Sequence, residues 1–231
     1  MSEDLVAPRL EVDWPVGPEL VDLDARQGVY AWVAFKLVSA DWYVDRLEAL
    51  LELVPQAEHQ VGVEMALDGV LSSLCSAVDA ACAGVIEAAE ARLSKPKATP
   101  KHQYGPQLAA QLLRECGRKR TPAALDAARR GGSTNSPEGW FAQLGRIRNT
   151  VVHRSALGRT HYVGGHLDGG VHMDIPGLGA KDPVVYLRGA RVKVVRLSEQ
   201  LLKEVTWLAP GQVVGQPSRS VTVTPETARA S

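Results

Sequence analysis

Two long stretches of the chain repeat apolar residues every three or four positions, which is the spacing of one face of an α-helix. They cover about residues 19–54 and 57–93. Pro55 separates them, because proline disfavours the helical conformation in the residue before it. The second stretch is rich in alanine and glycine, which permit close approach by a neighbouring helix. The pattern predicts two long antiparallel helices of a bundle.

Four shorter helices are predicted after these two. They cover, in order, about residues 106–116, a segment starting at Thr121, a segment running from Ser136 to about His153 or Arg154, and residues 191–208. Thr121 and Ser136 are each followed by proline, which is the pattern of a helix N-cap and first helical position. Helices are therefore expected to dominate the chain.

The periodicity changes between the last two helices. Residues 159–175 read RTHYVGGHLDGGVHMDI, with Asp168 and Gly169 as a turn signal between β-type residues, and they predict a hairpin. Residues 183–189 are a candidate third strand. The predicted fold is all-α: an up-and-down helical bundle over 19–208 with a small β-hairpin insertion at about 159–188.

The two ends of the chain carry weaker patterns. Residues 1–18 hold three prolines and are expected to form an extended arm, whereas residues 209–231 are rich in Pro, Gly, Ser and Thr and are expected to be disordered. The N-terminal residues are acidic and lack the apolar core of a signal peptide, and no apolar run has the length of a membrane span. We therefore expect a cytoplasmic protein without membrane contact.

The composition hides an asymmetry of charge. The chain has 231 residues, 45% hydrophobic and 23% charged, with no net charge. Residues 1–94 hold 17 acidic and 5 basic side chains, whereas residues 95–160 hold 13 basic and 3 acidic ones. The basic segment either attracts phosphate or neutralises the acidic helices by packing on them.

Within the basic segment, residues 145–155 read GRIRNTVVHRS. On a helical wheel Trp140, Leu144, Ile147 and Val151 form the core stripe, with Arg148 at its edge. The wheel turns Arg146, Asn149 and His153 away from the core. Histidine titrates near neutral pH and arginine binds phosphate with two parallel hydrogen bonds, so this cluster suits cleavage of RNA by its own 2′-hydroxyl.

RNTVVH, residues 148–153, resembles the R-x4-6-H motif of the HEPN superfamily (higher eukaryotes and prokaryotes nucleotide-binding), with Asn149 at the favoured polar position. The resemblance implies a helical bundle that forms a homodimer and brings two motifs together. It also implies metal-independent endoribonuclease activity and a role in toxin–antitoxin or anti-phage systems, with an antitoxin or another protein as partner. Arg148 would hold the phosphate, Asn149 would orient it, and His153 would be the acid–base group.

Other residues qualify these expectations. RNA phosphates are expected to contact five basic side chains: Arg118, Lys119, Arg120, Arg146 and Arg154. His161, His166 and His172 match no usual ligand spacing, so neither a metal nor a cofactor is expected. Cys75, Cys82 and Cys116 read as buried or free thiols.

The alternative from another class is a non-catalytic bundle that binds a protein partner, with Arg148 and His153 as ordinary surface groups.

Overall fold

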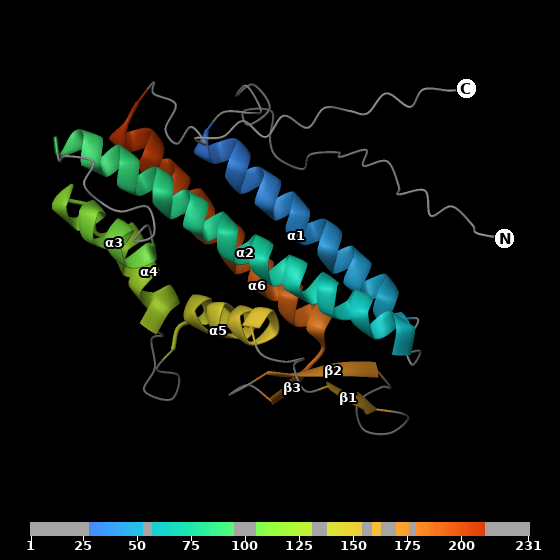
Figure 1. Cartoon of the computed structure of the whole chain (residues 1–231). Helices are drawn as coiled ribbons and strands as arrows, with labels where there is room; N and C mark the ends of the chain where they lie inside the picture. Colours follow the sequence, from blue (N-terminus) through green and yellow to red (C-terminus); the bar gives the residue numbers. More distant parts are fainter. Residues whose placement is uncertain are drawn as a thin grey trace, which may run out of the picture.

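In the computed structural model, three long helices form the frame of the molecule: α1 (Val29–Glu52), α2 (Ala57–Arg92) and α6 (Pro183–Leu208). Figure 1 shows them side by side, with α2 in the middle. The structure describes residues 28–52, 57–94, 105–130, 138–153, 159–162, 170–175 and 179–210. In these residues helices dominate, which confirms the predicted all-α class.

Helices α1 and α2 run antiparallel, as predicted. Leu50, near the end of α1, lies against Gly62, near the start of α2, and Val29 at the other end lies against Gly84. Between these contacts the ring of Tyr43 lies on Gly69, where a Cβ atom would be 2.5 Å from the ring. The small residues of α2 therefore let the two helices approach closely.

Helix α6 also runs antiparallel to α1. The Tyr30 hydroxyl donates to the carbonyl of Leu202 at 2.8 Å, while Arg188 donates to Glu48 at 2.6 Å near the opposite ends. Since α2 and α6 both oppose α1, they run parallel to each other (Figure 1). Residues 93–182 therefore return the chain to the end of the frame where α2 begins.

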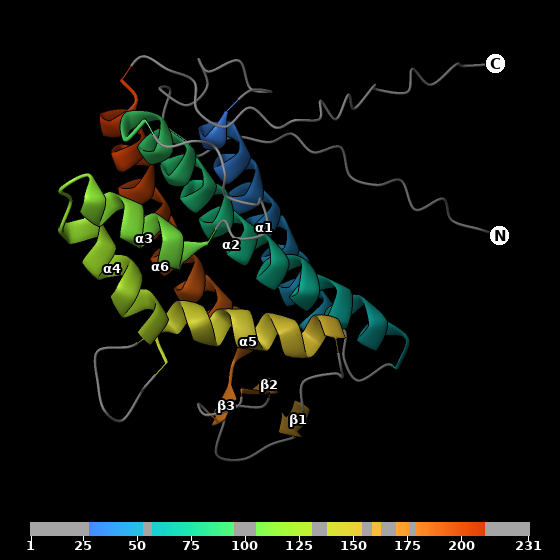
Figure 2. The ribbon, with the colours of Figure 1, turned by 60° about the vertical axis from the view of Figure 1, so that its left-hand side comes forward.

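That return segment contains three shorter helices: α3 (Pro106–Glu115), α4 (Arg120–Arg130) and α5 (Trp140–His153). Arg114 pairs with Asp126 and Arg129 donates to Gln107, so α3 and α4 form an antiparallel pair. Helix α5 crosses the frame at a steep angle below them (Figure 2). The carbonyl of Arg129 accepts from Gly139 N–H at 2.9 Å, which joins the end of α4 to the start of α5.

Three short strands precede α6: β1 (Arg159–Tyr162), β2 (Gly170–Ile175) and β3 (Gly179–Lys181). They pair antiparallel in that order, with Thr160 opposite His172 and Asp174 opposite Ala180. The strands lie beyond α5 at one end of the frame (Figure 1). The turn signal at Asp168 and Gly169 is outside the described residues, so the hairpin as a whole stays a prediction.

The last helix begins earlier than predicted. Residues 183–189, which we expected in a strand, form the first two turns of α6, so the prediction of a helix start at 191 was wrong. The Asp182 side chain accepts from Val185 N–H at 2.9 Å and Pro183 occupies the first turn. This N-cap and proline pattern is the one that marks helix starts elsewhere, whereas two adjacent valines and a tyrosine suggested a strand.

The remaining predictions concern two helix N-caps and the two ends of the chain. Thr121 was expected to cap α4, but α4 begins at Arg120 and Thr121 lies in its first turn. Ser136 and the predicted arm and tail at 1–18 and 211–231 lie outside the described residues.

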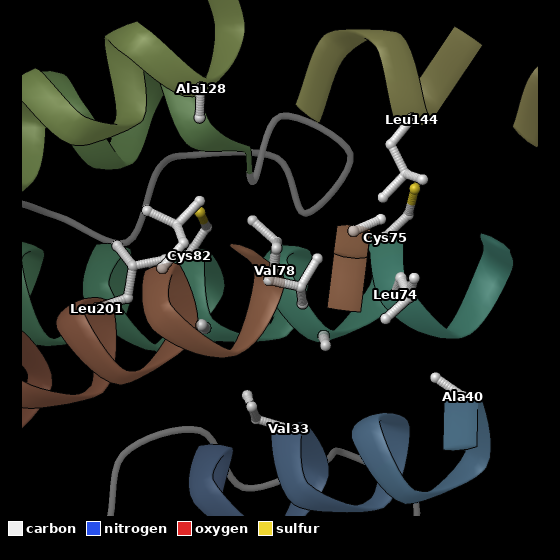
Figure 3. Packing of buried hydrophobic residues seen from close by; sticks show 14 of the residues in the cluster. Val33, Ala40, Leu74, Cys75, Val78, Cys82, Ala128, Leu144 and Leu201 are labelled. Atoms are coloured by element: carbon white, nitrogen blue, oxygen red, sulfur yellow. The ribbon is translucent and has the colours of Figure 1, made fainter. Parts of the chain in front are cut away.

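The core lies where α2 meets α1, α5 and α6. Leu74, Val78 and Cys82 of α2 are buried with Leu144 and Leu201 of the neighbouring helices (Figure 3). The segment Val61–Arg92 is long and apolar enough to cross a membrane by length and composition, yet 67% of its most apolar window is buried in the fold. This burial is what a core helix requires, and it is compatible with a soluble protein.

Candidate functional site on helix α5

Helix α5 presents its apolar face to the core, as the wheel predicted. Leu144 and Ile147 are completely buried, and Trp140 and Val151 pack against the core cluster. Leu144 and Cys75 point toward each other between α5 and α2 (Figure 3). The predicted core stripe is therefore confirmed, and it fixes which side chains of α5 can face outward.

Arg148 lies at the edge of this buried face and is half-buried. Its Nη2 donates to Oδ1 of the exposed Asn149 at 3.2 Å. Two neighbouring residues of the RNTVVH segment thus form one polar pair on the helix surface. The guanidinium has five N–H donors, so donors remain for other groups.

The charge of Arg148 acts on two groups of α2, Cys75 and Asp79. Burial raises the pKa of Cys75 to about 12, although Arg148 opposes the shift. Burial also raises the pKa of the Asp79 carboxyl above its ordinary value, and again Arg148 acts in the opposite direction. Desolvation therefore outweighs the attraction of the arginine at both groups.

Arg146 lies two residues before Arg148 on the same helix and is exposed. It forms an ion pair with Glu138 at 3.2 Å, just before the start of α5. It also lies near Tyr186 in the first turns of α6, where burial raises the pKa of the phenol and Arg146 lowers it. The two arginines thus connect α5 to different neighbours, Arg148 to α2 and Arg146 to α6.

His153 is the last residue of α5, and its side chain lies outside the described residues. Arg154 lies outside them as well. The expectation that Asn149 and His153 point in the same direction therefore stays a prediction. Helical spacing of four residues is its only support.

Arg118, expected to bind RNA, makes a structural ion pair. Its Nε donates to Oε2 of the buried Glu204 at 2.6 Å, and Glu204 also accepts from the Thr121 hydroxyl at 2.6 Å. The Arg118 guanidinium and that of Arg92 each lie over the ring of Trp207, at 4.5 and 4.3 Å. The burial of Glu204 gives Arg118 a role in joining α6 to the turn between α3 and α4.

Lys119 and Arg120 are exposed beside Arg118, at the end of α4 remote from α5. Helix α4 has 11 residues, so it separates them from the start of α5 by about 16 Å. Figure 2 shows the α3–α4 turn and α5 at opposite ends of α4. The structure pairs Arg148 with Asn149, places Arg146 on the same helix, and leaves residues 118–120 apart from all three.

Metal-binding side chains do not gather in the part of the chain that the structure describes: it contains no cluster of three His, Cys, Asp or Glu suited to an ion. Cys75 and Cys82 are buried, Cys116 is half-buried, and none of these three described cysteines forms a disulfide. The described side chains around α5 carry guanidinium, amide, carboxyl, phenol and thiol groups.

Sequence reasoning missed Asp79 and Tyr186 and gave Cys75 only a packing role. Asp79 falls in the alanine-rich middle of α2, and Tyr186 in a segment that resembled a strand. Neither lies near residues 145–155 in the sequence, so only the packing of α2 and α6 on α5 brings them there. The one local signal was Asp79 itself, a carboxylate on a face of α2 lined by alanines.

Comparison with known proteins returns no match, whether to a protein-family model, a curated protein or a solved structure.

Proposed function

We propose that the chain is a HEPN-like, metal-independent endoribonuclease or RNA-binding protein that works as a homodimer. The observation that carries the proposal is the pair formed by Arg148 and Asn149. An arginine at the rim of the core, joined at 3.2 Å to an exposed asparagine, presents N–H donors and an amide at a helix surface. A phosphodiester with its ribose is a ligand of matching chemistry.

In this proposal each residue has a distinct role. Arg148 binds the scissile phosphate and stabilises the charge that develops on it. Asn149 orients Arg148 and the ribose, and His153 moves the proton between the 2′-hydroxyl and the leaving oxygen. Arg146 and Arg154 contact neighbouring phosphates, with Lys119 and Arg120 reaching a longer RNA further along the surface. The reaction needs no metal or cofactor.

The biological setting is proposed from the HEPN resemblance. It comprises a cytoplasmic protein of a toxin–antitoxin or anti-phage system, with an antitoxin or another protein as a possible regulator. In the homodimer two copies of α5 would face each other and complete one cleft. The segment containing β1–β3 follows α5 directly and would act as an insertion that borders that cleft.

The experiment that tests the proposal uses purified protein and mixed cellular RNA in EDTA. Wild-type protein should cleave the RNA, and the His153→Ala and Arg148→Ala variants should lose at least about 100-fold in rate. Lys193→Ala is the control, since this exposed residue lies in the middle of α6. Absence of cleavage by a folded, dimeric wild-type protein would reject the nuclease.

A second candidate is a non-catalytic bundle that binds a protein partner. One observation favours it: Trp32, Phe35 and Trp42 of α1 are 41–46% exposed, and the first two rings stack at 5.4 Å. Exposed aromatic side chains are frequent at protein interfaces. If this candidate is correct, Trp32→Ser and Trp42→Ser will abolish association measured by sedimentation, while Arg148→Ala will leave it unchanged.

A further inference from the structure

An exposed indole, that of Trp207, lies at the end of the frame where α2 and α6 both finish (Figure 1). Two guanidinium groups lie over its ring: the Cζ atom of Arg92 is 4.3 Å from the ring centroid and that of Arg118 is 4.5 Å from it. Arg92 is the last residue of α2, whereas Arg118 belongs to the turn between α3 and α4. Three segments that are far apart in the sequence therefore meet at one ring.

A buried carboxylate fixes one of these two arginines in place. The Nε and Nη2 atoms of Arg118 donate to Glu204 at 2.6 and 3.3 Å, and Glu204 is only 5% exposed. Glu204 lies three residues before Trp207 on α6, so the ion pair and the ring contact are neighbours on that helix. The carboxylate neutralises Arg118 and holds the α3–α4 turn beside Trp207.

Positive charge around Trp207 exceeds what this ion pair neutralises. Lys119 and Arg120 lie at the end of the α3–α4 turn, and Lys203 lies one turn before Trp207 on α6; all three side chains are exposed. Among the described residues no ion pair involves these three or Arg92. The last turn of α3 adds one exposed acid, Glu115, so this part of the surface keeps an excess of positive charge.

Stability of the fold accounts for only part of this arrangement. Arg118 compensates a buried carboxylate, and a positive charge at the end of α2 is favoured by the helix dipole, which accounts for Arg92. Exposed cations without a described partner contribute little to stability, so these two reasons leave Lys119, Arg120 and Lys203 unexplained. An accessible aromatic group beside several cations is the combination that binds single-stranded nucleic acid.

We propose that the surface formed by Trp207, Arg92, Lys119, Arg120 and Lys203, called here the Trp207 surface, is a second binding site for single-stranded RNA, remote from α5. This inference rests on the proposed function, which makes RNA the ligand. An arginine held over a ring by its charge keeps its N–H donors, and these bind phosphate oxygens. The guanidinium planes and the exposed part of the indole offer faces on which bases stack. Both kinds of contact tolerate any base sequence.

The test measures binding of a fluorescein-labelled, 2′-O-methylated RNA of about 15 nucleotides, a length typical of such sites, by fluorescence anisotropy at several salt concentrations. The 2′-O-methyl groups prevent cleavage by the proposed mechanism. Arg92→Gln and Lys203→Gln, alone and combined, remove cations from the Trp207 surface. Lys193→Gln is the matched control, because Lys193 is an exposed lysine of the same helix, about 15 Å before Lys203 along the axis.

Each substitution at the Trp207 surface should reduce the steepness of log Kd against log salt by about 0.7, because one phosphate contact is lost. The combined variant should bind RNA roughly 10-fold more weakly, whereas Lys193→Gln should match the wild type. RNA should also quench the tryptophan emission of the wild type more than that of Trp207→Phe. If Arg92→Gln does not fold, Lys203→Gln decides, since it changes an exposed side chain only. Equal affinity and salt dependence in Lys203→Gln and Lys193→Gln would overturn the inference.

Binding and cleavage together separate this inference from the proposed function. A wild-type protein that binds RNA through the Trp207 surface and cleaves none supports the inference and rejects the nuclease. Binding that is lost in Arg148→Ala and unchanged in the combined variant supports the proposed function and rejects the inference. Absence of RNA binding overturns the inference as well, including the case in which the protein binds vesicles of anionic phospholipid in place of RNA.

Discussion

Leu144 of α5 and Cys75 of α2 are both buried and point toward each other between the two helices (Figure 3). This packing joins the helix of the RNTVVH segment to the core helix α2. It leaves Arg148 at the edge of the buried face, where its Nη2 donates to Oδ1 of the exposed Asn149 at 3.2 Å. The properties of the fold around this contact are open to direct measurement.

Asp79→Asn should raise the free energy of unfolding at pH 7.5. The folded-state pKa of Asp79 lies above its ordinary value of 3.8, so the fold prefers the neutral carboxyl. The stability that Asp79 contributes is therefore lost as the pH rises from 3.8 through the folded-state pKa. The gain from Asp79→Asn should shrink between pH 7.5 and 4.5 in urea titrations. A variant less stable than the wild type at pH 7.5 would mean that attraction to Arg148 outweighs burial.

Gly139→Ala should destabilise the protein by about 1–3 kcal/mol. A Cβ atom at Gly139 would overlap the backbone carbonyl of Ala128, where the end of α4 meets the start of α5. At Gly145, in the middle of α5, an added Cβ atom would have no neighbouring atom within 4 Å. Gly145→Ala should therefore stabilise the helix by about 0.5–1 kcal/mol. Urea denaturation of both variants checks the contrast, and equal effects would contradict the close approach at Gly139.

Arg118→Ala should lower the free energy of unfolding by about 2 kcal/mol, because it leaves the buried carboxylate of Glu204 with one fewer charged partner. Arg120→Ala, two residues along and exposed, should change it by less than about 0.5 kcal/mol. Thermal and urea unfolding measure both. If Arg118→Ala weakens RNA binding without loss of stability, the structural role of Arg118 is refuted.

Thiol reagents should react quickly with only one cysteine of the native protein. Cys75 and Cys82 are buried, and burial raises the pKa of both thiols, so neither forms the reactive thiolate readily. Cys116 is half-buried. Titration with a disulfide reagent at pH 8 should give one fast thiol, none in Cys116→Ser, and three after denaturation. Fast reaction at Cys75 would show that the α2–α5 contact opens readily.

Local patterns predicted most of the helices and the buried face of α5. The periodicity of residues 57–93 and the stripe from Trp140 to Val151 each depend on one helix alone, so sequence spacing was sufficient. The direction of α6 was not predictable in this way, because it depends on the path of residues 93–182 across the frame. The N-cap at Asp182 was present in the sequence, but the valine-rich segment after it favoured a strand.

The candidate site was predictable only in part. Arg146, Arg148 and Asn149 were found from their own spacing on one helix. Asp79, Cys75 and Tyr186 come from α2 and α6, and no local pattern links them to α5. Arg118 shows the same limit: its basic neighbours suggested a phosphate contact, and no local pattern indicated its partner Glu204, which lies on a helix distant in sequence.

The most direct measurement compares two RNA oligonucleotides of one sequence, one unmodified and one 2′-O-methylated, incubated with the wild type in EDTA. The proposed mechanism predicts cleavage of the unmodified RNA alone, with 2′,3′-cyclic phosphate ends, and loss of cleavage in Arg148→Ala. Equal cleavage of both oligonucleotides, or cleavage that persists in Arg148→Ala, would contradict it.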